Sequence, residues 1–277
     1  MTAQSEIKSM ALFCDFENVA LGVREAKYPK FDIARVLEKL LLKGSIVVKK
    51  AYCDWERYKE FKAAMHEAAF ELIEIPHVRQ SGKNSADIRM VVDALDLCYT
   101  KSHVDTFVII SGDSDFSPLV SKLRENNKTV IGVGVKKSTS DLLIANCDEF
   151  IYYDDLVRET ESKKKRITKK APVSESVGDI PPKGKPRRSE EDKRQEALNL
   201  IQETFEALAA ERGDEEKIWG SMVKQALKRR KPGFNENYYG VRSFNALLEE
   251  AERAGLLRLE ADEKSGGYIL RMAARQE

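Results

Sequence analysis

Cysteine and histidine are scarce in this sequence of 277 residues, and neither type is clustered. There are four cysteines and three histidines, and no two cysteines form a Cys-x-x-Cys pair. This scatter argues against a zinc site and against a disulfide framework. Cys14, Cys98 and Cys147 lie in or beside apolar runs, as expected for free thiols buried in a protein of the reducing cytoplasm.

Long apolar runs are also missing, since no stretch approaches the roughly 20 apolar residues that a membrane helix needs. The first ten residues, MTAQSEIKSM, contain neither a charged leader nor an apolar core, so we expect no secretory signal. No G-x-G-x-x-G pattern follows the first apolar run, which disfavours dinucleotide binding. The sequence contains no internal repeat. We therefore expect a cytoplasmic protein without a membrane partner.

Net charge is small, at +1, and by itself predicts no partner, but it is unevenly distributed. Residues 1–157 carry −3, residues 158–190 carry +6 and residues 191–277 carry −2. The basic middle segment combines lysine runs with proline, serine and glycine, which is typical of a flexible linker. It is either a solvated tether or an arm that contacts nucleic-acid phosphates.

The first 157 residues alternate strand-like apolar runs with amphipathic helical segments. This alternation predicts an α/β fold, with a doubly wound, mainly parallel sheet covered by helices on both faces. We expect strands at 10–16, 45–53, 70–77, 105–111, 128–135 and 149–153. Apolar residues at helical spacing predict helices at 31–43, 56–69, 86–100 and 116–126.

Aspartates stand at the ends of two of these predicted strands. Asp15 ends the first strand, and Asp113 and Asp115 follow the fourth. Right-handed crossovers would place the first and fourth strands side by side, where the order of the sheet reverses. Ligands bind at such a switch point, beyond the carboxyl ends of the strands. We therefore expect these three carboxylates to meet there.

Asp87 reaches the same edge of the sheet from the helix predicted at 86–100. Taken alone, an aspartate at this position caps the helix and complements its dipole. Beside Asp15 and Asp113, it is better explained as a fourth member of the carboxylate cluster. The spacing predicts that the helix buries an apolar face made by Ile88, Val91, Val92, Leu95 and Tyr99.

Such a cluster of carboxylates indicates a metal site. Carboxylates held close together repel, and one of them is driven towards protonation unless a cation neutralises the group. Oxygen ligands without histidine or cysteine favour Mg²⁺ or Mn²⁺. An ion of this kind can activate water and stabilise the charge that develops on a phosphodiester. The chemistry therefore suits hydrolysis of nucleic acid, with one ion or two.

Three polar residues near the aspartates are further candidates. Asn18 could orient the attacking water or bind phosphate, or it could simply cap a helix or form a turn. Ser111 and the following Gly112 allow a tight turn that aims backbone N–H groups at phosphate. Lys83 could neutralise a phosphate, although a lysine in a loop is often merely solvated.

The motifs DFEN at 15–18, K-x-x-x-D at 83–87 and SGDSDF at 111–116 resemble those of the NYN domain in the PIN-like superfamily, especially its LabA-like branch. The resemblance covers about residues 8–155, although Asn84 stands where glycine is common. It implies a PIN-like fold and ribonuclease or nuclease activity that depends on Mg²⁺ or Mn²⁺. It also implies supporting roles for Asn18 and Ser111, and metal-site roles for Asp15, Asp87, Asp113 and Asp115.

Helical periodicity resumes after residue 190 and predicts a small winged-helix-like domain at 191–277. Three helical segments precede two short strand-like pieces around the turn ADEKSGG. The stretches KPGF at 231–234, YYG at 238–240 and SFNALL at 243–248 resemble the LOTUS (OST-HTH) domain. That resemblance implies binding of RNA, including guanine-rich or otherwise structured RNA, or of an RNA helicase or another RNA-processing protein.

Cations interleaved with aromatic residues in this domain suit contact with an RNA backbone and stacking on bases. In the alternative, Tyr238 and Tyr239 pack on the core while the cations solvate the surface. The candidate contact residues are Lys224, Lys228, Arg229, Arg230, Tyr239 and Arg242.

The sequence as a whole therefore predicts a metal-dependent ribonuclease, with an endonuclease domain at 1–157 and an RNA-binding module at 191–277. One rival is an RNA-binding adaptor protein whose first domain is catalytically silent, but the acidic set is complete. A phosphotransferase or phosphatase with an aspartate nucleophile is a second rival. That chemistry usually needs an early D-x-D, whereas Phe16 and Glu17 follow Asp15.

Overall fold

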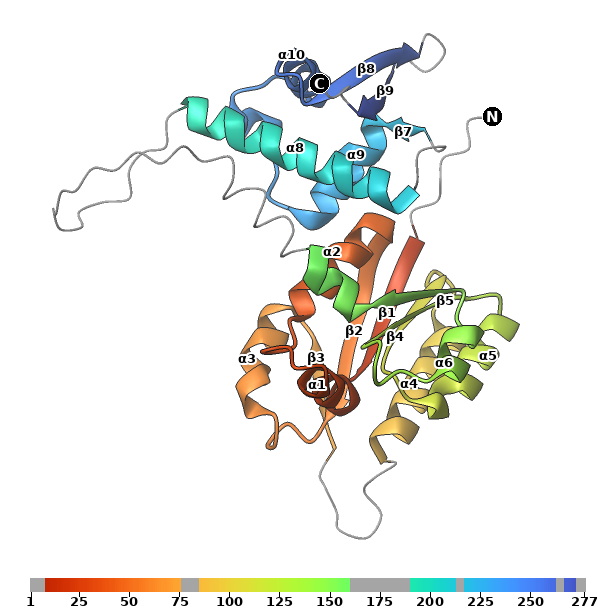
Figure 1. The fold of residues 1–277 in the computed structure, drawn as a ribbon. Coiled ribbons are helices and arrows are strands. Elements are labelled where there is room, and N and C mark those ends of the chain that lie inside the picture. Colours follow the sequence, from red (N-terminus) through yellow and green to blue (C-terminus); the bar gives the residue numbers. More distant parts are fainter. Residues whose placement is uncertain (1–7, 76–84, 160–189, 213–216, 263–266, 273–277) are drawn as a thin grey trace, which may run out of the picture. The chain divides into compact units, whose positions relative to one another are not determined.

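The computed structural model divides into two compact units, Met1–Pro172 and Val173–Glu277 (Figure 1). It describes residues 8–75, 85–159, 190–212, 217–262 and 267–272. The division falls inside the predicted linker at 158–190, most of which lies outside the described residues. Lys83 lies outside them as well, so its predicted role stays a prediction.

The first unit is built on a six-stranded sheet in the order β3-β2-β1-β4-β5-β6. Every neighbouring pair of strands is parallel. The first and fourth strands are thus neighbours, as the crossover argument predicts. The strands are β1 (Lys8–Asp15), β2 (Gly44–Cys53), β3 (Glu71–Glu74), β4 (Thr106–Ile110), β5 (Thr129–Gly134) and β6 (Glu149–Tyr152).

Helices cover both faces of this sheet (Figure 1). One face packs against α1 (Phe16–Glu25), α2 (Ile33–Lys43) and α3 (Lys59–Glu67). The other packs against α4 (Ser85–Thr100), α5 (Ser117–Glu125) and α6 (Asp141–Asn146). Four of these helices match the predicted segments, whereas α1 and α6 add to the prediction.

Strand β1 is the centre of the first unit because both of its faces are covered. Met10 and Leu12 belong to the core beneath α1 and α2, while Ala11 and Phe13 belong to the core beneath α4 and α5. All four side chains are fully buried. An uninterrupted apolar run is what a parallel strand at this position requires.

Helix α2 passes directly into β2, with Lys43 ending the helix and Gly44 beginning the strand. Gly44 pairs with Lys8 at the start of β1. A Cβ atom at position 44 would lie 2.3 Å from the carbonyl oxygen of Lys8, far inside contact distance. Glycine therefore allows the two strands to approach closely where β2 begins.

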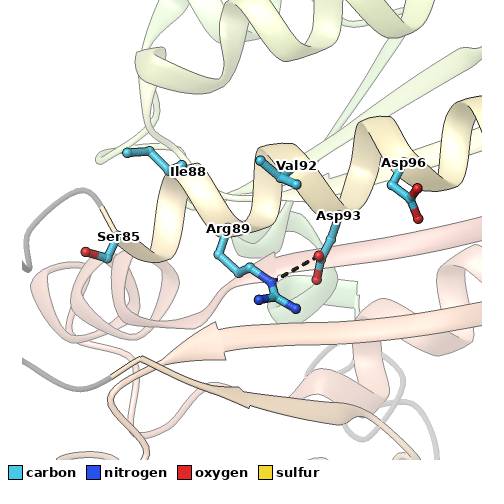
Figure 2. Close-up of a pocket in the computed structure, with 6 residues that line it drawn as sticks. All are labelled: Ser85, Ile88, Arg89, Val92, Asp93 and Asp96. Atoms are coloured by element: carbon cyan, nitrogen blue, oxygen red, sulfur yellow. Dashed lines mark hydrogen bonds and ion pairs between the residues drawn. The ribbon is translucent and has the colours of Figure 1, made fainter.

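The predicted apolar face of α4 is wrong in part. The helix buries Met90, Ala94 and Cys98. Ile88 and Val92, predicted to be in the core, are 63% and 55% exposed, and Figure 2 shows both side chains projecting from the same side of the helix. The apolar surface of α4 is wider than the part of the helix that contacts the sheet. The packed face is centred on the side of Met90, which leaves Ile88 and Val92 exposed.

Among its described residues, the second unit contains three α-helices and a small antiparallel sheet in the order β7-β9-β8. The predicted helical segments and the terminal hairpin are present, and a two-residue strand joins the hairpin. The winged-helix designation stays a prediction. The elements are α8 (Glu190–Arg212), β7 (Ile218–Trp219), α9 (Gly220–Arg230), η3 (Glu236–Tyr239), α10 (Phe244–Arg253), β8 (Leu257–Asp262) and β9 (Gly267–Met272).

Within the described residues, no helix is both long enough and apolar enough to cross a membrane. The four cysteines are free thiols, three of them buried.

Candidate active site

Asp15 is a buried carboxylate at the carboxyl end of β1, with 7% of its surface exposed. One oxygen, Oδ2, accepts a hydrogen bond from the Ser111 hydroxyl at 3.0 Å. The other, Oδ1, accepts from the backbone N–H of Asn18 at 3.3 Å, so Asp15 caps α1. Both oxygens are therefore held in a fixed orientation where the sheet order reverses.

Ser111 links two of the predicted aspartates. Its hydroxyl donates to Asp15 and accepts the backbone N–H of Asp113 at 3.2 Å. The residue is fully buried, however, so the prediction that Ser111 contacts substrate is corrected. Its geometry is that of a support for the aspartates.

Asn18 holds the loop that follows β4. Its side-chain oxygen accepts the backbone N–H of Gly112 at 2.8 Å. Gly112 in turn lies against the loop after β5, where an added Cβ atom would be 2.5 Å from the carbonyl oxygen of Ser138. Asn18 therefore positions the backbone between the aspartates, while its predicted direct role in the reaction stays a prediction.

Asp113 and Asp115 stand around the short helical turn η2 (Ser114–Phe116). The Asp113 side chain caps this turn by accepting the backbone N–H of Asp115 at 3.0 Å. Asp113 is half-buried, whereas Asp115 is exposed. The turn thus presents one fixed carboxylate and one that reaches into solvent.

Asp87 lies in the first turn of α4, and the helix is fastened to β2 through Asp93, six residues further along. Asp93 accepts a hydrogen bond from the Tyr52 hydroxyl at 2.9 Å and pairs with the Lys50 amine at 3.5 Å. It also pairs with Arg89 at 3.1 Å, as Figure 2 shows.

Tyr52 is the residue of β2 that pairs in register with Asp15 of β1. The contact between Tyr52 and Asp93 therefore ties the helix that bears Asp87 to the strand beside Asp15. The sequence patterns single out neither Asp93 nor Tyr52. No local pattern marks either residue, because their contact joins positions 41 residues apart.

Burial and neighbouring carboxylates raise the pKa values of Asp15 and Asp87. Burial, followed by the charge of Asp87, raises the pKa of Asp15 to about 7, although the hydrogen bonds from Asn18 and Ser111 lower it. Burial, followed by the charges of Asp113 and Asp115, raises the pKa of Asp87 to about 6. Mutual repulsion of this kind is what the sequence argument predicts for aspartates gathered at one edge.

Glu17 is a further acidic residue of this region that the sequence reasoning did not assign. Its charge contributes to the raised pKa of Asp87. Its side chain forms an ion pair with Arg57 at 3.3 Å. Its place within the DFEN motif, two residues after Asp15, is the signal that could have identified it.

The chemistry of this donor set fits a hard divalent cation, because among the described residues the charges that shift the pKa of Asp15 and Asp87 belong to Asp and Glu side chains. The geometry is less complete. Among the residues that the structure describes, no three His, Cys, Asp or Glu side chains are arranged to hold one ion together. The carboxylates thus interact electrostatically, but their side chains do not converge on a single point.

In the second unit, the predicted RNA contacts separate into exposed and packed residues. Lys228 and Arg242 are exposed. Tyr239 is 8% exposed and stacks on Phe234, so its predicted contact with RNA is corrected to a place in the core. Tyr238 is instead exposed, and Lys193 lies 4.8 Å from the centre of its ring.

The remaining predicted contacts on α9 have partners within the unit. Lys224 forms an ion pair with Glu236 at 2.8 Å, and Arg230 donates to the Thr204 hydroxyl at 3.2 Å. Arg229 is half-buried, and burial lowers its pKa. These three cations are less available to phosphate than Lys228 and Arg242.

Comparison with known proteins gives a family match that lies within the first unit. The family model of the NYN domain matches residues 9–154. An uncharacterized protein of Methanocaldococcus jannaschii is 28% identical over 138 residues, which is 49% of this chain and 54% of that protein. The chain thus spans about half the length of this curated relative.

A crystal structure of a protein of unknown function from Vibrio parahaemolyticus is also similar. It is 28% identical, with a TM-score of 0.49, and the match covers 55% of this chain and 96% of that one. At this TM-score the likeness carries no argument about fold.

Proposed function

Because this chain belongs to the NYN domain family, a family of PIN-like fold with generally nucleolytic members, we propose that its first unit is a ribonuclease dependent on Mg²⁺ or Mn²⁺. We propose that it cuts RNA internally. The observation that carries this proposal is the gathering of Asp15, Asp87 and Asp113 at the switch point of the sheet, where the charges of Asp87 and Asp113 raise the pKa of Asp15 and the charge of Asp113 raises the pKa of Asp87.

We propose that four carboxylates hold the ion. Asp15 and Asp113 are fixed by hydrogen bonds, whereas Asp115 is exposed and Asp87 lies on the first turn of a helix. The latter two are therefore the side chains that we expect to close on the ion. A divalent ion held there would lower the pKa of water and neutralise charge on the phosphodiester.

The protein's own residues supply orientation in this proposal. Ser111 keeps an oxygen of Asp15 directed by hydrogen bonding, and Asn18 keeps the backbone at Gly112 in place. Preorganisation of this kind lowers the cost of assembling the reacting groups. Hence we assign Ser111 and Asn18 positioning roles and give the chemistry to the aspartates.

For the second unit we propose RNA binding through its exposed cations and aromatic ring. Lys228 and Arg242 suit phosphate, and Tyr238 offers a ring face for stacking. A guanine-rich or structured RNA suits this combination. Binding to an RNA helicase without RNA affinity would contradict the assignment.

The direct test incubates end-labelled RNA with the full chain in Mn²⁺, in Mg²⁺ and in EDTA. We expect internal cleavage with either metal, none with EDTA, and none with Asp113→Asn. Asp155→Asn is the matched control, because Asp155 is an exposed aspartate that pairs with Arg158. Cleavage that survives EDTA or Asp113→Asn would contradict the proposal.

A catalytically silent RNA-binding adaptor is the second candidate, and it is favoured by the lack of three converging ligands among the described side chains. Filter binding in EDTA and in Mn²⁺ separates the two. RNA that is bound but never cleaved under any metal condition would establish the adaptor.

A further inference from the structure

Helix α4 exposes part of its apolar surface. Ile88 is 63% exposed, Val92 is 55% exposed and Tyr99 is 65% exposed. A surface hollow of about 580 Å³ lies along the same helix and includes Ile88 and Val92 in its lining. An apolar strip of this kind on one helix is a candidate interaction surface.

The exposed residues form one continuous strip. A helix turns by about 100° per residue, so positions 3, 4 and 7 residues from Val92 point in nearly the same direction. We call this strip the α4 stripe, and it consists of Ser85, Ile88, Arg89, Val92, Asp96 and Tyr99. Each of its members is exposed.

The two flanks of the α4 stripe differ in character. Arg89 and Asp96 lie on one side of Val92, rotated about the helix axis from the direction of Val92 by about 60° and 40°. Ile88 and Tyr99 lie on the other side, at about 40° and 20°. One flank therefore carries a cation and an anion, and the other is apolar.

The charged flank is complementary to itself. Two copies of α4 can pair antiparallel about a twofold axis that passes beside Val92. The charged flank of one helix then faces the charged flank of the other, and the two helices run in opposite directions. Arg89, three residues before Val92, would then lie opposite Asp96 of the second copy, which is four residues beyond Val92. The mismatch of one residue is about 1.5 Å along the helix, within reach of an arginine.

The apolar flank matches under the same operation. Ile88 would lie about 4.5 Å along the helix axis from Tyr99 of the second copy, and Val92 would meet Val92. Nucleic acid is a poor occupant by comparison, because Asp93 and Asp96 also line the hollow and repel phosphate.

We propose that two copies of this chain associate through the α4 stripe, with the helices antiparallel about Val92. A single helix pair buries less surface than the roughly 1,600 Å² of a standard interface, so the dimer forms reversibly, at about micromolar concentrations. The two Asp87 side chains then lie towards opposite ends of the helix pair. The proposal stands whether or not the first unit is a nuclease.

The test is sedimentation velocity of the full chain over a range of about 1–200 µM. We expect a concentration-dependent dimer for the wild type. Arg89→Glu alone and Asp96→Lys alone each place like charges across the interface, and each should raise the dissociation constant at least about 10-fold. Mixing these two variants makes both cross-pairs complementary, so the mixture should recover the dimer.

Two further variants keep the test decisive if Arg89→Glu destabilises the fold through its neighbour Asp93. Val92→Lys should abolish the dimer, whereas Leu142→Lys should leave it unchanged, because Leu142 is an exposed apolar residue of α6 outside the stripe. A monomer at every concentration would overturn the proposal. A dimer that is indifferent to Val92→Lys and to the charge changes would overturn it as well.

Discussion

Asp15 is a carboxylate in an environment that disfavours its charged form. Its surface is only 7% exposed, and the charge of Asp87 repels it. Its pKa is about 7 in the folded chain and near 3.8 for the ordinary side chain. The folded state therefore binds the proton more tightly than the unfolded state does. Stability from this group is fully present below about pH 4 and is lost as pH rises through 7.

We therefore predict that the metal-free protein becomes less stable between pH 5 and pH 7.5. Asp15→Asn should weaken this dependence, since the amide does not ionise, and Asp87, whose pKa is raised to about 6, should account for what is left of it; Asp155→Asn should leave the dependence intact. Each unit of difference in pKa between the folded and unfolded states corresponds to about 1.4 kcal/mol. Thermal melts in EDTA across this range provide the measurement. A melting temperature that rises over the same interval in the wild type would contradict the assignment.

Ser111→Ala removes the hydroxyl that donates to Asp15 and accepts from Asp113. We predict that Mn²⁺ affinity falls by about 10–100-fold, as is typical when a partner of a metal ligand is lost. The pKa of Asp15 should rise further, because the lost hydrogen bond stabilised the charged form. Calorimetric titration with Mn²⁺ gives the affinity, and Ser111→Thr, which keeps a hydroxyl, is the comparison. Equal affinity in all three proteins would show that Ser111 does not support the site.

At the scale of elements, α4 connects the site to the sheet. Tyr52 of β2 binds Asp93 of α4 and pairs in register with Asp15. Because Asp87 precedes Asp93 by six residues on the same helix, the placement of α4 on β2 sets how closely Asp87 approaches Asp15. A change at Tyr52 should therefore act on the metal site through the helix.

We predict that Tyr52→Phe lowers Mn²⁺ affinity about 10-fold or more and destabilises the fold by about 1.5–3 kcal/mol, since a hydrogen bond to a charged group is lost. Tyr28→Phe is the matched control, because the Tyr28 hydroxyl bonds Asp154 at 3.0 Å in another part of the unit. Urea unfolding and Mn²⁺ titration of both variants separate the two effects. If both variants lower metal affinity equally, α4 has no special positioning role.

The helices and strands differ in how well the sequence predicts their position and packing. The apolar run of β1 predicts a strand that is covered on both faces. The preference for right-handed crossovers then places this strand beside β4, which brings Asp15 near Asp113. Ile88 and Val92 misled the prediction of the α4 core, because periodicity reports an apolar face without telling what covers it. The contact of Tyr52 with Asp93 joins distant positions, so only coordinates reveal it.

At the scale of the whole molecule, the acidic residues 1–157 are followed by a strongly basic segment at 158–190 and then by residues 191–277. Repulsion between RNA phosphates and the carboxylates of the first unit makes an additional source of positive charge useful for binding. Lys228, Arg242 and the basic residues between 158 and 190 provide such charge.

We predict that removing residues 158–277 weakens RNA affinity and flattens its salt dependence more than it slows cleavage of bound RNA. Each lost phosphate contact should reduce the slope of log affinity against log salt by about 0.7 for single-stranded RNA. Fluorescence anisotropy at several salt concentrations measures the slope, and single-turnover cleavage measures the chemical step. Unchanged affinity in the shortened chain would assign binding to the first unit.

The close approach at Gly44 limits how this fold can be engineered. Since Lys43 and Gly44 join a helix to a strand without an intervening residue, a reporter peptide inserted there would separate β2 from β1 and carry Tyr52 away from its place beside Asp15. Ser102 and His103 lie in the exposed turn between α4 and β4. An insertion between these two residues would break neither the helix nor the strand. A split or circularly permuted version should be opened at that turn.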